Sequence, residues 1–364
     1  MLAQDSAFAR REERHSSRPR IDVGILGATG AVGQQFVALL AGHPWFRLAS
    51  LAASERSAGK TYGELSWRLP SALPEEAANL KVDPLKAGAG PQLVFSALDS
   101  SIAGEAEQEY AAAGHWVVSN ARNHRMDPLV PLLIPEVNAE HLQLLPLQKE
   151  KKGWRGAIVT DPNCSTIVLA IALAALRQFE LKRVLVTTLQ ALSGAGYPGV
   201  ASLDATANVI PHIGGEEAKI EDETQKILGR FNLGAVEPHP VKISATTTRV
   251  PVVNGHTESV SIELGQNVAL DEILSAFRDF SGPPQELALP SAPTKPVVYL
   301  DQPDRPQPRL DAERDGGMSI HVGRLRPCPV LGYKFILLGH NTIRGAAGAA
   351  ILNAELMVAN GLLD

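Results

Sequence analysis

The sequence predicts an α/β fold, with a parallel sheet near the N-terminus and a second, α+β domain after it. Three observations predict this class. A glycine-rich turn joins a first strand to a first helix, strands and helices alternate up to about residue 160, and longer β-type segments follow. Buried strands that alternate with helices are typical of a parallel sheet with crossover helices. A chain of 364 residues is long enough for two or three domains.

The elements of the first part are short and apolar. We expect strands at residues 21–26, 47–53, 93–97 and 116–119, a helix that follows the glycine turn and contains Phe36 to Leu40, and a helix at residues 105–113. The second part carries longer segments, several of which alternate between apolar and polar residues. We expect strands at residues 182–192, 241–250, 256–264, 318–326 and 333–338 and a helix at residues 346–360. The proline-rich stretch 283–309 is expected to be irregular coil or an excursion from the domain.

Composition excludes several classes of protein. The net charge of -5 gives no basic surface for nucleic acid, and the longest apolar run, residues 167–176, is too short to cross a membrane. Two cysteines do not make a disulfide framework, which favours a cytoplasmic enzyme. The first twenty residues lack the apolar core of a secretory signal, so we interpret residues 1–20 as a disordered extension.

The first candidate site is the glycine loop Gly27-x-x-Gly30-x-x-Gly33. A dinucleotide pyrophosphate needs a close backbone approach without a Cβ atom, and a helix N-terminus that points at the anion. The position between a first strand and a helix favours nucleotide binding over a plain turn.

The loop after the second strand bears on the choice of cofactor. Ser54, Arg56 and Ser57 provide hydroxyl and guanidinium groups that suit a ribose 2′-phosphate, whereas the nearby Glu55 is the residue type that suits a 2′-hydroxyl. We interpret the loop as favouring NADP. An ordinary exposed loop remains the alternative.

Cys164 is the strongest single candidate for chemistry. It follows Asp161-Pro162-Asn163 directly before an apolar helix, where Asn163 can cap and where free N–H groups stabilise a thiolate. We therefore expect a lowered pKa and a nucleophilic role. From position alone, a buried structural cysteine is equally compatible, and we interpret Cys328 in this way.

A nucleophilic thiolate needs polar partners. Arg249 and His256 lie seven residues apart on two strand-like segments that can meet at one pocket if they pack side by side, and Gln190 ends another strand. No metal site is expected, because His-Glu-x-x-His and zinc-type cysteine spacings are absent. The sequence also lacks a P-loop and a Tyr-x-x-x-Lys pair.

Together these motifs resemble the aspartate-β-semialdehyde dehydrogenase family over residues 20 to 364. The resemblance rests on Gly27-Ala-Thr-Gly-Ala-Val-Gly33, on Pro162-Asn-Cys-Ser-Thr166, on Gln190, and on Arg249 with His256 seven residues later. The segments Ser119-Asn-Ala-Arg-Asn-His-Arg-Met-Asp127 and His340-Asn-Thr-Ile-Arg-Gly345 are similar to the archaeal and fungal branch.

The resemblance implies a fold and an activity. The fold would be a Rossmann-type NADP-binding domain of residues 21–163 plus 344–364, with a catalytic and dimerisation domain of residues 164–343. The reaction would be NADPH-dependent reductive dephosphorylation of L-aspartyl-4-phosphate to L-aspartate-4-semialdehyde, in the pathway to lysine, threonine, methionine and isoleucine. The implied assembly is a homodimer or homotetramer.

The resemblance also implies residue roles. Cys164 would form a thioester, His256 would take and return a proton, and Gln190 would orient the acyl-enzyme. The implied substrate and phosphate ligands are Arg249, Arg125, Lys219, Asn163 and Glu217, with Glu216 as the alternative to Glu217. The implied cofactor-binding residues are Gly27, Thr29, Gly30, Ala31, Val32, Gly33, Ser54, Arg56, Ser57 and Asn341.

Two other functions stay open at this point. One is a reductase of an acyl-CoA or of N-acetylglutamyl phosphate on the same scaffold. The other is a non-enzymatic NADP-sensing protein, which would not need Cys164, Gln190 and His256 together.

Overall fold

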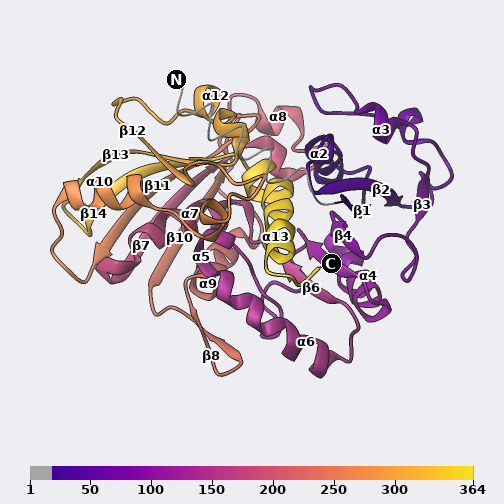
Figure 1. Cartoon of the computed structure of the whole chain (residues 1–364). Coiled ribbons are helices and arrows are strands. Elements are labelled where there is room, and N and C mark those ends of the chain that lie inside the picture. Colours follow the sequence, from indigo (N-terminus) through magenta and orange to yellow (C-terminus); the bar gives the residue numbers. More distant parts are fainter. Residues whose placement is uncertain (1–18, 364) are drawn as a thin grey trace, which may run out of the picture.

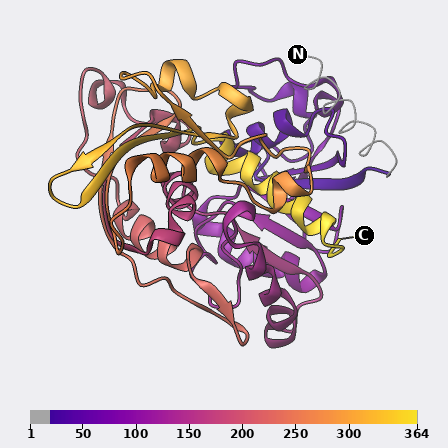
Figure 2. The ribbon, with the colours of Figure 1, turned by 60° about the vertical axis from the view of Figure 1, so that its left-hand side comes forward.

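The computed structural model describes residues 19–363, so the predicted extension lies outside the described residues up to position 18. Two β-sheets lie side by side, with the C-terminal helix between them (Figures 1 and 2). The predicted fold class, a parallel sheet followed by a second, mixed sheet, is confirmed.

The first sheet has six strands, and every pairing in it is parallel. In spatial order the strands are β3 (Val82–Pro84), β2 (Phe46–Ala53), β1 (Ile21–Leu26), β4 (Leu93–Ser96), β5 (Trp116–Ser119) and β6 (Ala157–Thr160). The helices of this part are α2 (Ala31–Leu40), α3 (Glu75–Ala78), α4 (Ser100–Ala113), α5 (Pro135–Asn138) and α6 (Leu144–Lys152), with 3-10 turns η1 (Tyr62–Glu64) and η2 (Ala139–Gln143). This strand order, 3-2-1-4-5-6, is that of dinucleotide-binding Rossmann folds.

The second sheet is mixed. In spatial order its strands are β10 (Lys242–Arg249), β7 (Leu181–Gln190), β11 (His256–Leu264), β14 (Gly332–Gly339), β13 (Ile320–Cys328) and β12 (Val297–Leu300). The two outer pairs are parallel, and the central pairs are antiparallel. A separate two-stranded ribbon pairs β8 (Arg230–Asn232) with β9 (Ala235–Glu237).

Long and short helices accompany this sheet along the chain. The long ones are α7 (Cys164–Ala175), α9 (Glu216–Ile227) and α10 (Leu270–Asp279), and the short ones are α8 (Ser202–Ala205), α11 (Pro283–Glu286) and α12 (Pro308–Asp311), with 3-10 turns η3 (Arg177–Phe179), η4 (Leu192–Ala195) and η5 (Arg314–Gly317). Helix α7 is apolar all round and is buried in one hydrophobic cluster with side chains of the sheet, as expected for a helix with no polar face. The proline-rich stretch, predicted as coil, contains β12 and two short helices. The prediction missed them because each is only four residues long.

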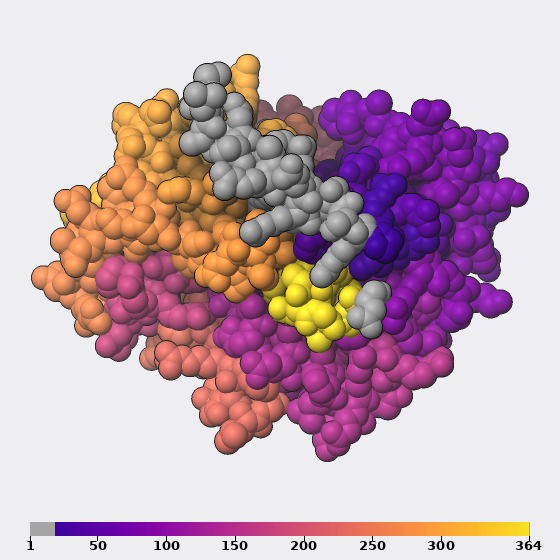
Figure 3. All heavy atoms as spheres, viewed as in Figure 1, coloured from indigo at the N-terminus to yellow at the C-terminus, as the bar shows by residue number. Residues whose placement is uncertain are grey.

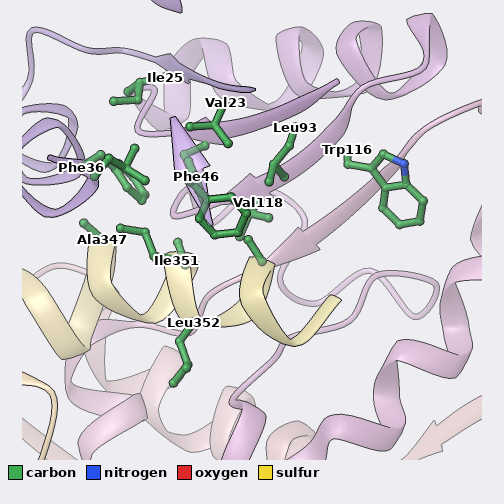
Figure 4. Close-up of a cluster of buried hydrophobic side chains, with 14 of the residues drawn as sticks. Val23, Ile25, Phe36, Phe46, Leu93, Trp116, Val118, Ala347, Ile351 and Leu352 are labelled. Carbon is green, nitrogen blue, oxygen red and sulfur yellow. The ribbon is translucent and has the colours of Figure 1, made fainter. Parts of the chain in front are cut away.

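The chain ends by returning to the first sheet. After a π-helical turn η6 (Ile343–Ala347), helix α13 (Gly348–Ala359) shares a hydrophobic cluster with strands β1, β2 and β4. Figure 4 shows Ala347 and Ile351 of this segment facing Phe36, Phe46 and Val23. The far end of α13 reaches the surface between the two parts of the molecule (Figure 3). The division of the chain into residues 21–163 plus 344–364 and residues 164–343 stays a prediction.

Candidate active site

The site is built on the start of helix α7. Strand β6 ends at Thr160, and Asn163 then caps the helix, because its Oδ1 accepts the backbone N–H groups of Ser165 (3.0 Å) and Thr166 (3.3 Å). Cys164 is therefore the first residue of the helix, as the sequence predicts.

His256, the first residue of β11, faces this cysteine. Its Nε2 lies 3.1 Å from the Cys164 sulfur. Its Nδ1 accepts the backbone N–H of Ala191 at 3.0 Å, so the neutral ring carries its hydrogen on Nε2 and donates it toward the sulfur. The imidazole is completely buried. The two side chains form the nucleophile–imidazole pair that covalent catalysis requires.

The electrostatics of this pair differ from the expectation. Burial, followed by the negative charge of Glu216, raises the pKa of the Cys164 thiol to about 12, although Arg125 and Arg249 act in the opposite direction. Burial and the charge of Arg249 lower the pKa of His256 to about 3. The pair is therefore a neutral thiol beside a neutral imidazole.

The predicted lowering of the Cys164 pKa is thus wrong. The Ser165 N–H, which also donates to the Asn163 side chain, still acts to lower the Cys164 pKa, but burial and the charge of Glu216 outweigh it. Gly345 also packs against the cysteine so closely that a Cβ atom on it would lie 2.8 Å from the Cys164 Cβ. Loss of solvent outweighs the helix N-terminus.

Glu216 is the centre of a polar cluster beside the thiol. Its Oε1 accepts from Lys219 Nζ at 2.5 Å, and its Oε2 accepts from Asn163 Nδ2 at 2.7 Å and from Gln190 Nε2 at 3.3 Å. Burial raises the pKa of Glu216, but the Lys219 hydrogen bond and charge and the two amide donors outweigh it and lower the pKa overall. Glu216 is therefore an anion that holds three of the predicted site residues.

Glu217 does not join this cluster, which corrects its predicted place in the site. Its Oε1 accepts the backbone N–H of Thr247 at 3.1 Å, and Glu221, one turn later, accepts the N–H of Ala245 at 2.9 Å. Both belong to β10, the edge strand of the sheet, whose outer N–H groups need acceptors. Glu217 thus covers a strand edge. Glu216, the alternative to Glu217 in the sequence analysis, is the glutamate that lies beside the thiol.

Two arginines border the cluster. Arg249 ends β10 next to Gln190 in register, and its Nη1 donates to the Ala191 carbonyl at 2.8 Å. Arg125 donates from Nη1 to Glu223 at 3.1 Å and from Nη2 to the Asn120 carbonyl at 2.8 Å. Both guanidinium groups are close enough to Cys164 to stabilise its thiolate form.

Sequence reasoning missed two residues that hold these groups. Glu223 joins Arg125 to the helix start, because its Oε2 also accepts the Asn163 backbone N–H at 2.6 Å. Gly194 lies against the site, since a Cβ atom on it would come 3.0 Å from Arg249 Nη1 and from His256 Cε1. A signal for Glu223 was present: Glu216, Lys219 and Glu223 have the spacing of one helix face.

The glycine loop has the geometry that an anion needs. Gly27 has a φ of +80°, and a Cβ atom on it would lie 2.5 Å from the Ala97 carbonyl oxygen, while one on Gly33 would overlap the Gly27 carbonyl. Gly30 caps α2 with no side chain, is exposed, and is followed by no acidic residue in the first turn. Thr29, Ala31 and Val32 are half-buried around it.

Other predicted cofactor residues lie at two places. Ser54, Arg56 and Ser57 directly follow β2, where Ser54 and Arg56 are exposed and Ser57 is half-buried. Asn341 is buried, and its amide bridges two loops of the site: its Oδ1 accepts from the Gly255 N–H at 2.9 Å, and its Nδ2 donates to Ser193 Oγ at 2.8 Å.

Residues 19–363 contain no group of three or more His, Cys, Asp or Glu placed to hold a metal ion. No helix in that same range has the length and apolar character needed to cross a membrane.

A Rossmann-type sheet joined to a half-buried cysteine that faces a buried histidine defines a class: nucleotide-dependent dehydrogenases that work through a cysteine. Two family models match this chain, "Semialdehyde dehydrogenase, NAD binding domain" over residues 22–145 and "Semialdehyde dehydrogenase, dimerisation domain" over residues 173–344. The chain belongs to the aspartate-semialdehyde dehydrogenase family.

Individual relatives align with this chain over nearly their whole length. Aspartate-semialdehyde dehydrogenase of Archaeoglobus fulgidus is 52% identical over 341 residues, which are 93% of this chain and 98% of the relative. The enzyme of Cryptococcus neoformans is 48% identical over 366 residues, with 96% and 100% covered. The crystal structure of the Candida albicans enzyme with NADP has a TM-score of 0.87 at 40% identity and covers 95% of this chain and 100% of its own.

Proposed function

We propose that this chain catalyses the NADPH-dependent conversion of L-aspartyl-4-phosphate to L-aspartate-4-semialdehyde and phosphate, and the reverse reaction. The observation that carries the proposal is the Cys164 sulfur 3.1 Å from His256 Nε2, with Arg125 and Arg249 beside it. The relatives described above bear the name of this activity. They do not favour an acyl-CoA reductase, an N-acetylglutamyl-phosphate reductase or a non-enzymatic sensor.

The glycine loop and the loop after β2 contain residues that fit NADPH. The Gly27–Gly33 turn is so tight that a Cβ atom on Gly27 or Gly33 would overlap backbone atoms of the protein, and the start of α2, which no side chain caps, offers N–H groups to a pyrophosphate. We propose that Thr29, Ala31 and Val32 line this turn. Ser54, Arg56 and Ser57 hold the 2′-phosphate. Asn341 orders the two loops that contain Gly255 and Ser193. The chemistry that NADPH supplies when bound is hydride donation to a thioester carbon.

The first step belongs to Cys164. Its sulfur attacks the acyl carbon of the substrate, the bond from this carbon to the phosphate oxygen breaks, and the thiol proton leaves with the phosphate. Because the ligand-free thiol is neutral, the proton is lost only as the sulfur becomes bonded to carbon. The product is a thioester on Cys164.

His256 directs its Nε2–H group at the Cys164 sulfur. Nε2 is the ring nitrogen that faces the sulfur, and with Nδ1 occupied by the Ala191 N–H the ring is set as a donor. It stabilises negative charge on the sulfur and on the oxygen of the thiohemiacetal. The proton transfer predicted for His256 requires the hydrogen to leave Nε2 first, which the Ala191 contact opposes.

The charged residues bind the ends of the substrate. We propose that Arg249 pairs with the α-carboxylate and that Arg125 and Lys219 hold the phosphate, since fixed positive charge suits both. Glu216 lies where it can meet the substrate ammonium group. Asn163 uses both groups of its side chain within the protein, so its part is to position the helix start and Glu216.

The test is phosphate-dependent reduction of NADP with aspartate semialdehyde, run beside succinic semialdehyde. Oxidation of NADPH by malonyl-CoA, measured in the opposite direction, tests for an acyl-CoA reductase. Cys164→Ala is expected to abolish turnover and to leave NADP binding unchanged, whereas the matched control Cys328→Ala is nearly silent. Residual activity above about a thousandth of wild type would place the nucleophile elsewhere.

We also propose a homodimer or homotetramer. The family model that matches residues 173–344 is described as a dimerisation domain, and Leu185 and Leu189 of β7 expose 45% and 38% of their surface on the open face of the second sheet. Light scattering on the purified protein distinguishes these states from a monomer. A cytoplasmic location, proposed from the cysteine usage, is tested by cell fractionation.

A further inference from the structure

A second concave surface lies at the far end of the second sheet. Strands β7, β10 and β11 have one end at the active site, at Gln190, Arg249 and His256. Their other ends line a groove of about 910 Å³. Because β7 has ten residues and a strand rises about 3.3 Å per residue, roughly 30 Å separates the groove from the Cys164–His256 pair.

The groove is strongly positive, although the whole chain has a net charge of -5. Its lining contains five arginines and lysines against two glutamates: Arg177, Lys182, Arg183, Arg230 and Lys242 against Glu180 and Glu263. Each glutamate is already paired, Glu180 with Lys182 at 3.1 Å and Glu263 with Arg183. Within residues 19–363, Arg177, Arg230 and Lys242 have no carboxylate within ion-pair distance, although the negative charge of Glu140 acts on Arg177 from further away.

Three basic groups gather at one end of the groove. The Nε and Nη2 atoms of Arg177 are buried and have no hydrogen-bond partner. His239 accepts the Val241 N–H on Nδ1 at 3.1 Å, which leaves its Nε2 free to donate. Burial and the nearby positive charges of Arg177 and Arg230 lower the pKa of His239. Burial lowers the pKa of Arg177, on which the negative charge of Glu140 and the positive charge of Arg230 act in opposite directions.

This gathering is unfavourable without an anion. Like charges repel, and unpartnered donors of a buried guanidinium carry a desolvation cost that is larger than for neutral groups. Nε and Nη2 also form the edge of a guanidinium that binds two oxygens of a phosphate or carboxylate at once. An anion between Arg177, Arg230 and His239 would remove both costs.

A second basic pair lies at the sheet itself. Arg183 and Lys242 are register partners on β7 and β10, and both are exposed. Arg183 is paired with Glu263, whereas Lys242 has no ion-pair partner within residues 19–363. The groove thus has two separate groups of cations, and its volume is far larger than one phosphate ion needs. A ligand with a single charge would leave one group unmatched.

We propose that this groove is a second anion-binding site, which takes a small molecule carrying at least two phosphate groups. Arg177, Arg230 and His239 bind one phosphate, and Arg183 with Lys242 binds another. The proposal does not depend on the reaction proposed above, because no residue of the groove belongs to the active site.

The experiment is calorimetric titration of inorganic tripolyphosphate into the full-length protein saturated with NADP, which keeps the cofactor site filled. Arg230→Gln and Lys242→Gln remove exposed groove charges, and Arg177→Gln removes the buried one. Arg47→Gln is the matched control, because it removes the same charge from an exposed ion pair with Asp22 in the first sheet. A parallel titration with citrate distinguishes phosphate from carboxylate ligands.

Wild type and Arg47→Gln are expected to bind tripolyphosphate equally, with an affinity that falls as salt rises from 50 to 200 mM. Each groove variant is expected to bind at least fivefold more weakly. Absence of binding to wild type, equal binding by groove variants and control, or loss of binding in Arg125→Gln instead would overturn the proposal. Citrate binding as tight as tripolyphosphate binding would overturn the phosphate assignment.

Discussion

The neutral state of the Cys164–His256 pair makes a quantitative prediction about the free enzyme. With a thiol pKa of about 12, the thiolate fraction at pH 7 is about 10⁻⁵, whereas an unperturbed cysteine with a pKa of about 8.5 has about 3%. Because the thiolate is the nucleophile, Cys164 is expected to be alkylated roughly 3,000-fold more slowly than a free cysteine at this pH.

The assay is alkylation by iodoacetamide between pH 6 and pH 10, followed by mass spectrometry of the Cys164 peptide. A Cys328→Ala background leaves Cys164 as the only cysteine of the chain. The logarithm of the rate is expected to rise by one per pH unit throughout, without a plateau. A plateau that begins below pH 8 would show a thiolate–imidazolium pair and would refute the reasoning.

The same alkylation assay tests which charges shift the pKa of the Cys164 thiol. The Glu216 carboxylate disfavours the thiolate, so Glu216→Gln lowers the thiol pKa and increases the alkylation rate at pH 8. Arg249 favours the thiolate, so Arg249→Gln has the opposite sign and slows alkylation. If both variants shifted the rate in one direction, charge would not be what distinguishes them, and altered access to the sulfur would be the better account.

Three further predictions concern turnover. Gly194→Ala would place a Cβ atom 3.0 Å from His256 and Arg249, so we expect kcat to fall about tenfold or more with the protein still folded, and an unchanged kcat would show that the loop moves aside. His256→Ala should lower kcat by about 10²–10³-fold because the Nε2 donor is lost, whereas Arg249→Lys should mainly raise KM because an ammonium group does not copy a bidentate fork; steady-state kinetics separate the two, and two pure KM effects would contradict the role of His256. Arg56→Ala should weaken kcat/KM for NADP about tenfold and leave NAD nearly unchanged, and equal losses would mean that Glu55 recognises the ribose.

Much of the fold was predictable because its signals are local. The strands of the first sheet are short apolar runs bounded by glycine and polar residues, and β1, β5 and the glycine loop lie where the pattern places them. The register of the second sheet brings Gln190, Arg249 and His256 to the same end of three neighbouring strands. From the sequence we could only say that these residues meet if their strands pack side by side, because local sequence patterns do not show which strands are neighbours.

The choice between Glu216 and Glu217 shows why neighbouring residues are hard to assign. Consecutive residues of a helix point about 100° apart, so one of two adjacent glutamates faces the thiol and the other faces β10. No helix was predicted at residues 216–227, and without its boundaries the sequence does not fix which face is which. The spacing of Lys219 and Glu223 from Glu216 carries that information once the helix is recognised.

The protonation state of Cys164 depends on parts of the chain that a local motif does not contain. The Pro-Asn-Cys sequence determines the helix start and hence the direction in which the helix N-terminus acts on the sulfur. Solvent is excluded by Gly345, which is almost half the chain away, and the opposing charge comes from Glu216. Because desolvation shifts a pKa by more than a helix terminus does, these distant contacts decide the sign of the shift. A nucleophile kept neutral in this way loses its proton only when a substrate has arrived to bond with the sulfur, and the free enzyme is thereby protected from unselective alkylation and oxidation.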